Sequence, residues 1–223
     1  MPLNWILFDL DGTLYPSSSG LLPEVGRRIQ KWVADYLELS WDEAYRVRRD
    51  YFQRYGTTLE GLIIEHGIDA DDYLAFVHDI PIEDYLALDP ALAAMLAGLP
   101  LRRGIYTNAT TEYTWRVLRT LGVSEHFSQV VSIEVVGLRN KLFRDAYERA
   151  LALINASGEE CIMVEDSARN LRVAKELGMV TVLLTDDGRG SEQSQMEGSV
   201  DFLVESVLDV GRVVHHIVGG QAT

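Results

Sequence analysis

Short apolar runs that end in polar residues constrain the fold of this chain more than any other feature. Three of them are residues 5–8 before Asp9, residues 104–106 before Thr107 and residues 161–164 before Glu165. Further candidates lie at residues 130–133, 180–184 and 201–204. Apolar runs of this length, bounded by turn-forming residues, predict buried strands.

Helical patterns separate the later runs, at residues 111–121, 142–154 and 170–177. A chain that alternates strand and helix forms a parallel sheet whose helices cover both faces. The sequence therefore predicts an α/β fold with a Rossmann-like parallel sheet core.

Residues 21–98 break this rhythm, because they contain no convincing strand. Four amphipathic helical patterns fill them instead, at residues 25–37, 41–55, 58–65 and 71–78. Ser40 and Glu43 have the spacing of a capping box that opens the second helix. We therefore predict an all-helical cap domain at residues 16–89, inserted after the first strand of a catalytic core made of residues 1–15 and 90–223.

Charge and cysteine content narrow the classes of partner. The formal net charge is −14, and an acidic surface repels nucleic acid and anionic membranes, so we expect neither as a partner. Cys161 is the one cysteine, which excludes an intrachain disulfide and is typical of a reducing compartment. No secretory or membrane-spanning pattern is evident. We expect a cytoplasmic protein, monomeric or a small homo-oligomer, whose anionic ligands require local cations.

The first strand is followed by two acidic residues, Asp9 and Asp11, which flank Leu10. In extended backbone both carboxylates leave the same side, and they repel unless a cation or a proton intervenes. A hard divalent cation such as Mg²⁺ resolves this repulsion and suits phosphate chemistry. An acidic strand end with a turn at Gly12 is the simpler structural interpretation of the same residues.

Other polar residues follow the later strands. These are Thr107 and Asn108, Glu165 and Asp166, and a cation, Lys141, before the helix that follows the fourth strand candidate. Parallel sheets bind ligands beyond the carboxyl ends of their strands. Taken singly, the acidic and hydroxyl residues also fit helix caps and turns, and a lysine is usually solvated. Their occurrence at successive strand ends favours a phosphate and metal site.

These motifs resemble those of the haloacid dehalogenase-like (HAD) phosphatases. The matching segments are residues 8–14 (FDLDGTL), Thr107-Asn108, Lys141 with the Ala-Tyr pair that follows it, and residues 164–167 (VEDS) with Asn170. The helical insert is similar to the mobile cap of that superfamily. Residues 14–18, 51–62 and 106–109 resemble most closely the pyrimidine 5′-nucleotidase-like group.

The resemblance implies a role for each motif residue. Asp9 is expected to be the nucleophile and Asp11 the general acid and base, with its backbone carbonyl toward the metal. Mg²⁺ would be held by Asp9, Asp11, Asp166 and Glu165, whereas Thr107, Asn108 and Lys141 would bind the phosphoryl oxygens and support catalysis. Leu142 stands where the lysine motif often has proline, so Arg139 is a second candidate for the cation.

We therefore expect a Mg²⁺-dependent phosphomonoester hydrolase that acts through an aspartyl-phosphate on a small phosphorylated metabolite. A pyrimidine nucleoside 5′-monophosphate is the candidate substrate. Tyr15, Tyr51, Phe52 and Tyr55 are candidates for contact with its base, although aromatic residues at helical spacing are usually core, and Tyr15 is the one to test. The alternatives are a phosphoglycolate or sugar-phosphate phosphatase and a phosphoglucomutase-like phosphotransferase. Asp11 disfavours a dehalogenase, which needs no acid for an alkoxide, and the intact motif set disfavours a non-catalytic binding module.

Overall fold

A parallel β-sheet forms the centre of the computed structural model, which describes residues 2–185 and 198–220. Its strands run in the order β3-β2-β1-β4-β5-β6 and every neighbouring pair is parallel. The strands are β1 (Trp5–Phe8), β2 (Arg102–Tyr106), β3 (Gln129–Val131), β4 (Cys161–Glu165), β5 (Val180–Leu184) and β6 (Phe202–Val204). The predicted α/β class and parallel sheet are confirmed.

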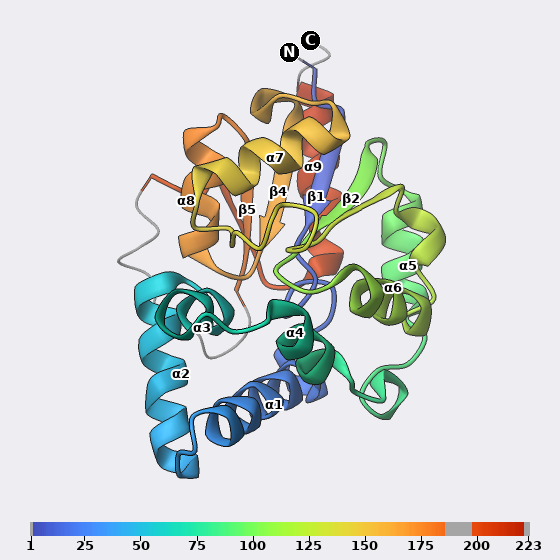
Figure 1. The fold of residues 1–223 in the computed structure, drawn as a ribbon. Helices are drawn as coiled ribbons and strands as arrows, with labels where there is room; N and C mark the ends of the chain where they lie inside the picture. The colour runs from blue at the N-terminus through green and yellow to red at the C-terminus, as the bar shows by residue number, and fades with distance from the viewer. Residues whose placement is uncertain (1, 186–197, 221–223) are drawn as a thin grey trace.

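Helices cover both faces of the sheet (Figure 1). They are α5 (Pro90–Ala97), α6 (Thr111–Thr120), α7 (Arg144–Ile154), α8 (Ala168–Glu176) and α9 (Val210–Gly220). The helical patterns in the sequence predict α6, α7 and α8 within a few residues of these bounds, but α5 and α9 were not predicted. All of β1 is buried, as is typical of a strand that helices cover on both sides.

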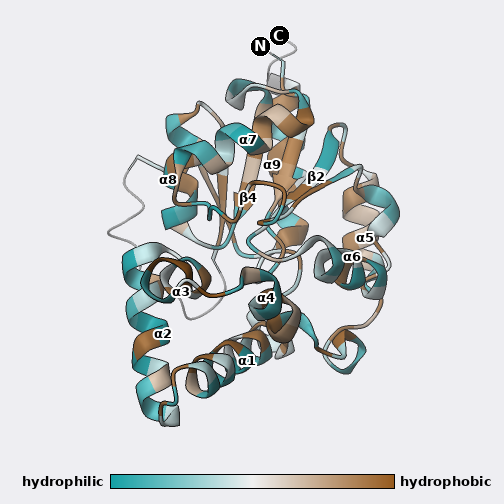
Figure 2. Ribbon diagram, viewed as in Figure 1, coloured by the Kyte–Doolittle hydropathy of each residue, from teal (hydrophilic) through white to brown (hydrophobic). Residues whose placement is uncertain are grey.

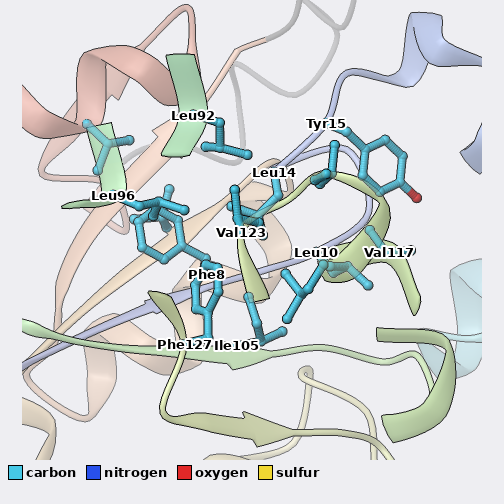
Figure 3. Packing of buried hydrophobic residues seen from close by; sticks show 14 of the residues in the cluster. Phe8, Leu10, Leu14, Tyr15, Leu92, Leu96, Ile105, Val117, Val123 and Phe127 are labelled. Atoms are coloured by element: carbon cyan, nitrogen blue, oxygen red, sulfur yellow. The ribbon is translucent and has the colours of Figure 1, made fainter. Parts of the chain in front are cut away.

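The two faces of β1 belong to two separate apolar cores. Ile6 and Phe8 pack in one cluster, and Figure 3 shows Phe8 there beside Ile105 and Phe127. Trp5 and Leu7 belong to the other cluster, together with apolar residues of α7 and α8. Successive side chains of a strand point to opposite faces, so four apolar residues in a row supply both cores. This burial holds Asp9 at a fixed position where β1 ends.

The segment between β1 and β2 is helical, as the sequence predicted. It contains α1 (Leu21–Tyr36), α2 (Trp41–Tyr55), α3 (Thr58–His66) and α4 (Ala70–His78), which lie together below the sheet in Figure 1. They pack around an apolar cluster that includes Val33, Leu62 and Tyr73, to which Ile133 from beyond β3 also contributes. The capping box of Ser40 and Glu43 is present at the start of α2. Figure 2 shows much of α2 as hydrophilic, in contrast to the central strands.

Polar contacts join this helical insert to the rest of the chain. Glu60 of α3 is buried and accepts hydrogen bonds from Arg139 and from Asn140 Nδ2. Arg169 of α8 donates to two carbonyl oxygens in the last turn of α2, at 3.4 and 3.3 Å. A cation there complements the helix dipole. Within the described residues, no helix combines the length and apolar composition that crossing a membrane requires.

His78 lies at the contact between α4 and α6, and it makes stability depend on pH. Its ring lies against that of Tyr113, with centroids 4.5 Å apart and ring planes tilted by 31°. Burial lowers the pKa of His78 from 6.5 to about 4. The charge of Glu134 raises this pKa and that of Arg116 lowers it. Between these values the unfolded chain binds a proton that the folded chain excludes. The free energy of unfolding should therefore fall by about 2 kcal/mol between pH 7 and pH 5 on account of this residue.

Urea unfolding at both pH values checks this prediction. His78→Gln should show a smaller pH-dependent loss than the wild type. His215, which is exposed on α9, supplies the matched variant His215→Gln, which should keep the wild-type dependence. Equal losses in the wild type and His78→Gln would contradict the prediction.

Candidate active site

The carboxyl ends of β2, β1 and β4 bring the predicted site residues to one edge of the sheet. Asp9 directly follows β1 and Thr107 directly follows β2. Glu165 is the last residue of β4 rather than the first after it, and Asp166 follows. Because the three strands are parallel neighbours, their ends coincide. The acidic residues thus come from β1 and β4, and the hydroxyl comes from β2.

Lys141 reaches this edge from the loop between β3 and α7. Its Nζ donates to Asp9 Oδ1 and, at 2.7 Å, to Glu165 Oε2, and its side chain is 1% exposed. Burial alone lowers the pKa of Lys141, but the two carboxylates outweigh this and raise the pKa above its ordinary value. The lysine is therefore charged. The other candidate, Arg139, pairs with Glu60 and Asp145 instead.

Three carboxylates could hold a metal ion. Asp9, Glu165 and Asp166 each offer an oxygen, and these oxygens lie within 4.8 Å of one another. Gly12 has φ +86°, and a Cβ there would lie 2.5 Å from Asp166 Oδ2. A side chain at this position would therefore clash with the Asp166 carboxylate, and glycine avoids the clash. An all-oxygen, negatively charged donor set fits a hard divalent cation such as Mg²⁺.

Glu165 is held on both sides of its carboxylate. Lys141 contacts Oε2, and Asn170 Nδ2 donates to Oε1 at 2.9 Å. Burial raises the pKa of Glu165 above its ordinary value, and the charge of Asp9 raises it further. The pocket therefore carries more negative charge than Lys141 balances, and a bound divalent cation would relieve this excess.

Asp11 differs from the three carboxylates in its hydrogen-bond partners, which are two tyrosine hydroxyl groups. Its Oδ1 accepts from the hydroxyl of Tyr15 and, at 3.1 Å, from that of Tyr113. Burial raises the pKa of Asp11 to about 7; the Tyr15 and Tyr113 hydrogen bonds oppose this rise, and the charges of Asp9 and Asp166 add to it. A carboxyl group with this pKa can both donate and accept a proton near neutral pH.

Two of the predicted phosphate-binding residues also support the loops around the site. Thr107 is buried, and its Oγ1 accepts from the backbone N–H of Ala109 at 3.0 Å. Asn108 Oδ1 accepts from the backbone N–H of Lys141 at 3.3 Å. Asn108 therefore ties the end of β2 to the loop that carries the lysine.

A cavity of about 900 Å³ opens above these residues. Asp9, Asp11, Thr107, Asn108, Glu165 and Asp166 line it at the sheet edge, and residues of α1 to α4 form much of the remaining wall. Its volume is that of a small-molecule site. Every predicted site residue except Lys141 lines it, and Lys141 lies beneath, in contact with Asp9.

Comparison with known proteins gives the family. A model of the haloacid dehalogenase-like hydrolases matches residues 3–178 of the chain. The chain belongs to this family. It is 29% identical over 232 residues to the glyceraldehyde 3-phosphate phosphatase of Methanopyrus kandleri, covering 96% of each protein. It is 25% identical to phosphate metabolism protein 8 of Saccharomyces cerevisiae, but spans only 60% of that protein and 79% of its own length.

Solved structures of HAD proteins share the fold. A HAD phosphatase from Thermococcus onnurineus superposes with a TM-score of 0.65 at 19% identity, covering 98% of this chain and 99% of the other. The predicted superfamily is therefore confirmed, and the chain is a hydrolase of this family. The comparisons do not show the narrower pyrimidine 5′-nucleotidase-like group.

The structure changes two expectations about this HAD site and adds one residue. Tyr15 is 2% exposed with its hydroxyl on Asp11, so its ring is core and not a contact for a base. Arg139 is engaged by Glu60, away from Asp9. Tyr113 was missed, because it lies within α6 and no local motif distinguishes it from the other apolar positions of that helix.

Proposed function

We propose that this protein is a Mg²⁺-dependent phosphomonoesterase that forms an aspartyl-phosphate on Asp9. The observation that carries the proposal is the pairing of Asp9 with the buried cation Lys141, beside Asp11, on the wall of a cavity of substrate size. Nucleophile, charge balance and proton donor are thus within one pocket.

The first half of the reaction transfers the phosphoryl group. An Asp9 carboxylate oxygen forms a bond to phosphorus while the bond from phosphorus to the leaving oxygen breaks. Asp11, with a pKa of about 7, donates its proton to that oxygen, so the product leaves as an alcohol. The Lys141 ammonium group orients Asp9 and offsets negative charge on the transferred group.

The second half releases phosphate. Asp11, now ionised, removes a proton from a water molecule as its oxygen attacks phosphorus, and the bond to Asp9 breaks. The Tyr15 and Tyr113 hydroxyl groups hold Asp11 in place for both proton transfers. We propose that Thr107 and Asn108 bind the phosphoryl oxygens, as they line the same wall.

The metal would be held by the side chains of Asp9, Asp166 and Glu165 and by the backbone carbonyl of Asp11. Bound there, Mg²⁺ supplies positive charge that neutralises the phosphoryl oxygens and the acidic cluster. We also propose the division into a core of residues 1–15 and 90–223 and a cap of residues 16–89. The separate apolar cluster of the insert supports this division.

The substrate is proposed to be a small phosphorylated metabolite. The relative named glyceraldehyde 3-phosphate phosphatase supports this class of substrate. A pyrimidine nucleoside 5′-monophosphate stays the narrower prediction from the sequence, with phosphoglycolate and sugar phosphates as its rivals. A phosphoglucomutase-like transfer shares the same first half-reaction.

Phosphate release with and without Mg²⁺ tests the proposal. The panel contains UMP, CMP, AMP, 2-phosphoglycolate, glyceraldehyde 3-phosphate and hexose phosphates. Release that requires Mg²⁺ supports the phosphomonoesterase. Formation of an isomeric sugar phosphate without free phosphate would replace it by the phosphotransferase, and no reaction with any compound would overturn it.

A further inference from the structure

Arg48 of α2 is a cation on the cavity wall, and it has no acidic partner among the residues that the structure describes. Its side chain is half-buried, and its one hydrogen bond goes from a terminal nitrogen to the carbonyl oxygen of Gly26, at 2.9 Å. Across residues 2–185 and 198–220, no carboxylate forms an ion pair with it. Burial lowers the pKa of Arg48, and the nearby Tyr73 and Tyr45 oppose this effect. In a chain of net charge −14, an unpaired guanidinium group in a cavity indicates an anionic ligand.

Gly26 makes room for this guanidinium group. It lies inside α1, where a Cβ would stand 2.8 Å from one Arg48 terminal nitrogen and 3.3 Å from its Cζ. Glycine within a helix is less stable than alanine. Glycine at this position therefore leaves the space that the guanidinium group occupies.

Tyr73 of α4 adds a hydroxyl group to the same wall. Its side chain is buried and lines the cavity. Burial raises the pKa of Tyr73, and the charge of Arg48 acts against this rise, so the two groups are close enough to interact. Apolar residues Leu22, Val25 and Val77 also line the cavity. Arg49 of α2 lines it as well. The insert therefore presents two arginines and a hydroxyl group beside these apolar side chains.

We propose that Arg48, aided by Tyr73, binds a second anionic group on the leaving-group part of the substrate, either a carboxylate or a second phosphoryl group. The proposal rests on the phosphomonoesterase function, because the scissile phosphate occupies the Asp9 end of the cavity. It predicts that compounds with two anionic groups are better substrates than nucleoside 5′-monophosphates, whose one anionic group is the scissile phosphate.

Matched substrate pairs test the proposal and separate its two chemistries. 3-Phosphoglycerate differs from glycerol 3-phosphate by a carboxylate, and fructose 1,6-bisphosphate differs from fructose 6-phosphate by a phosphoryl group. The wild type should have the higher kcat/KM for the member with two anionic groups in at least one pair, and which pair responds identifies the group. Equal values in both pairs would overturn the proposal.

Arg48→Met should lower kcat/KM for the preferred compound with two anionic groups by about 10- to 100-fold. The value for its partner, whose one anionic group is the scissile phosphate, should stay within about threefold, since that compound makes no bond to the arginine. Arg46→Met is the matched control, because Arg46 is exposed on the same helix. A uniform loss on both members of the pair would assign Arg48 a structural role and overturn the proposal.

Gly26→Ala tests the same site without removing the charge. The added methyl group displaces the guanidinium group. The preference for the compound with two anionic groups should therefore fall, while the melting temperature stays equal or rises. This variant carries the test if Arg48→Met does not fold. An unchanged preference would count against the proposed position of the anion.

Calorimetric binding to Asp9→Asn protein with Mg²⁺ separates the proposal from the function on which it rests. The compound with two anionic groups should bind Asp9→Asn more tightly than its partner, and this difference should be lost in Asp9→Asn/Arg48→Met. Such a result supports the subsite even if the wild type releases no phosphate. If the wild type releases phosphate but Asp9→Asn binds both members equally, the function stands and the subsite fails.

Discussion

Asp9→Asn should reduce phosphate release by at least about 10⁴-fold, the largest effect we expect from any single substitution. An amide oxygen is a poor nucleophile, so the aspartyl-phosphate cannot form and no other residue offers the same route. The fold should survive, because Lys141 keeps its 2.7 Å contact with Glu165. Steady-state phosphate release and the melting temperature measure the two expectations.

Detection of the intermediate makes this prediction specific to a covalent route. Acid-quenched wild-type protein should show the added mass of one phosphoryl group on the peptide that contains Asp9, and Asp9→Asn should not. Asp72→Asn is the control, because this carboxylate is exposed in the first turn of α4. Substantial turnover by folded Asp9→Asn would show that the covalent mechanism is wrong.

Lys141→Met should affect both activity and stability. Phosphate release should fall by about 10²- to 10³-fold, because a positioned cation near the developing charge is lost. Without metal, the free energy of unfolding should fall by about 3–5 kcal/mol, since removing one partner of a buried ion pair leaves the Asp9 and Glu165 carboxylates uncompensated. Urea unfolding measures this loss, and Mg²⁺ should restore part of it.

Lys31→Met is the matched control for this variant. Lys31 pairs with Asp35 on the surface of α1, where both side chains are about half exposed, so its loss should cost less than about 1 kcal/mol. If Lys141→Met kept both activity and wild-type stability, the charge balance proposed for Asp9 would have to come from another group.

Local patterns in the sequence sufficed for the sheet and for the position of the acidic residues. A strand that is buried on both faces must be apolar at every position, so residues 5–8 stand out, and the residue that follows lies at the sheet edge. The helical insert was also predictable from a local pattern, because its apolar residues recur with a helical period. The helix α5 was missed because its Ala- and Leu-rich segment has little amphipathic pattern.

The tertiary structure decided which side chains meet. Lys141 and Arg139 are two residues apart, yet one contacts Asp9 and the other Glu60, because the loop turns them toward different elements. The hydrogen bond from the Tyr113 hydroxyl to Asp11 joins residues 102 positions apart in the sequence. Such partners depend on how helices pack on the sheet, and no local pattern of hydrophobicity records that packing. The sequence by itself therefore determined the strands, most of the helices and the motif residues. Only the folded chain determined which partners set the charge and the proton affinity of each motif residue.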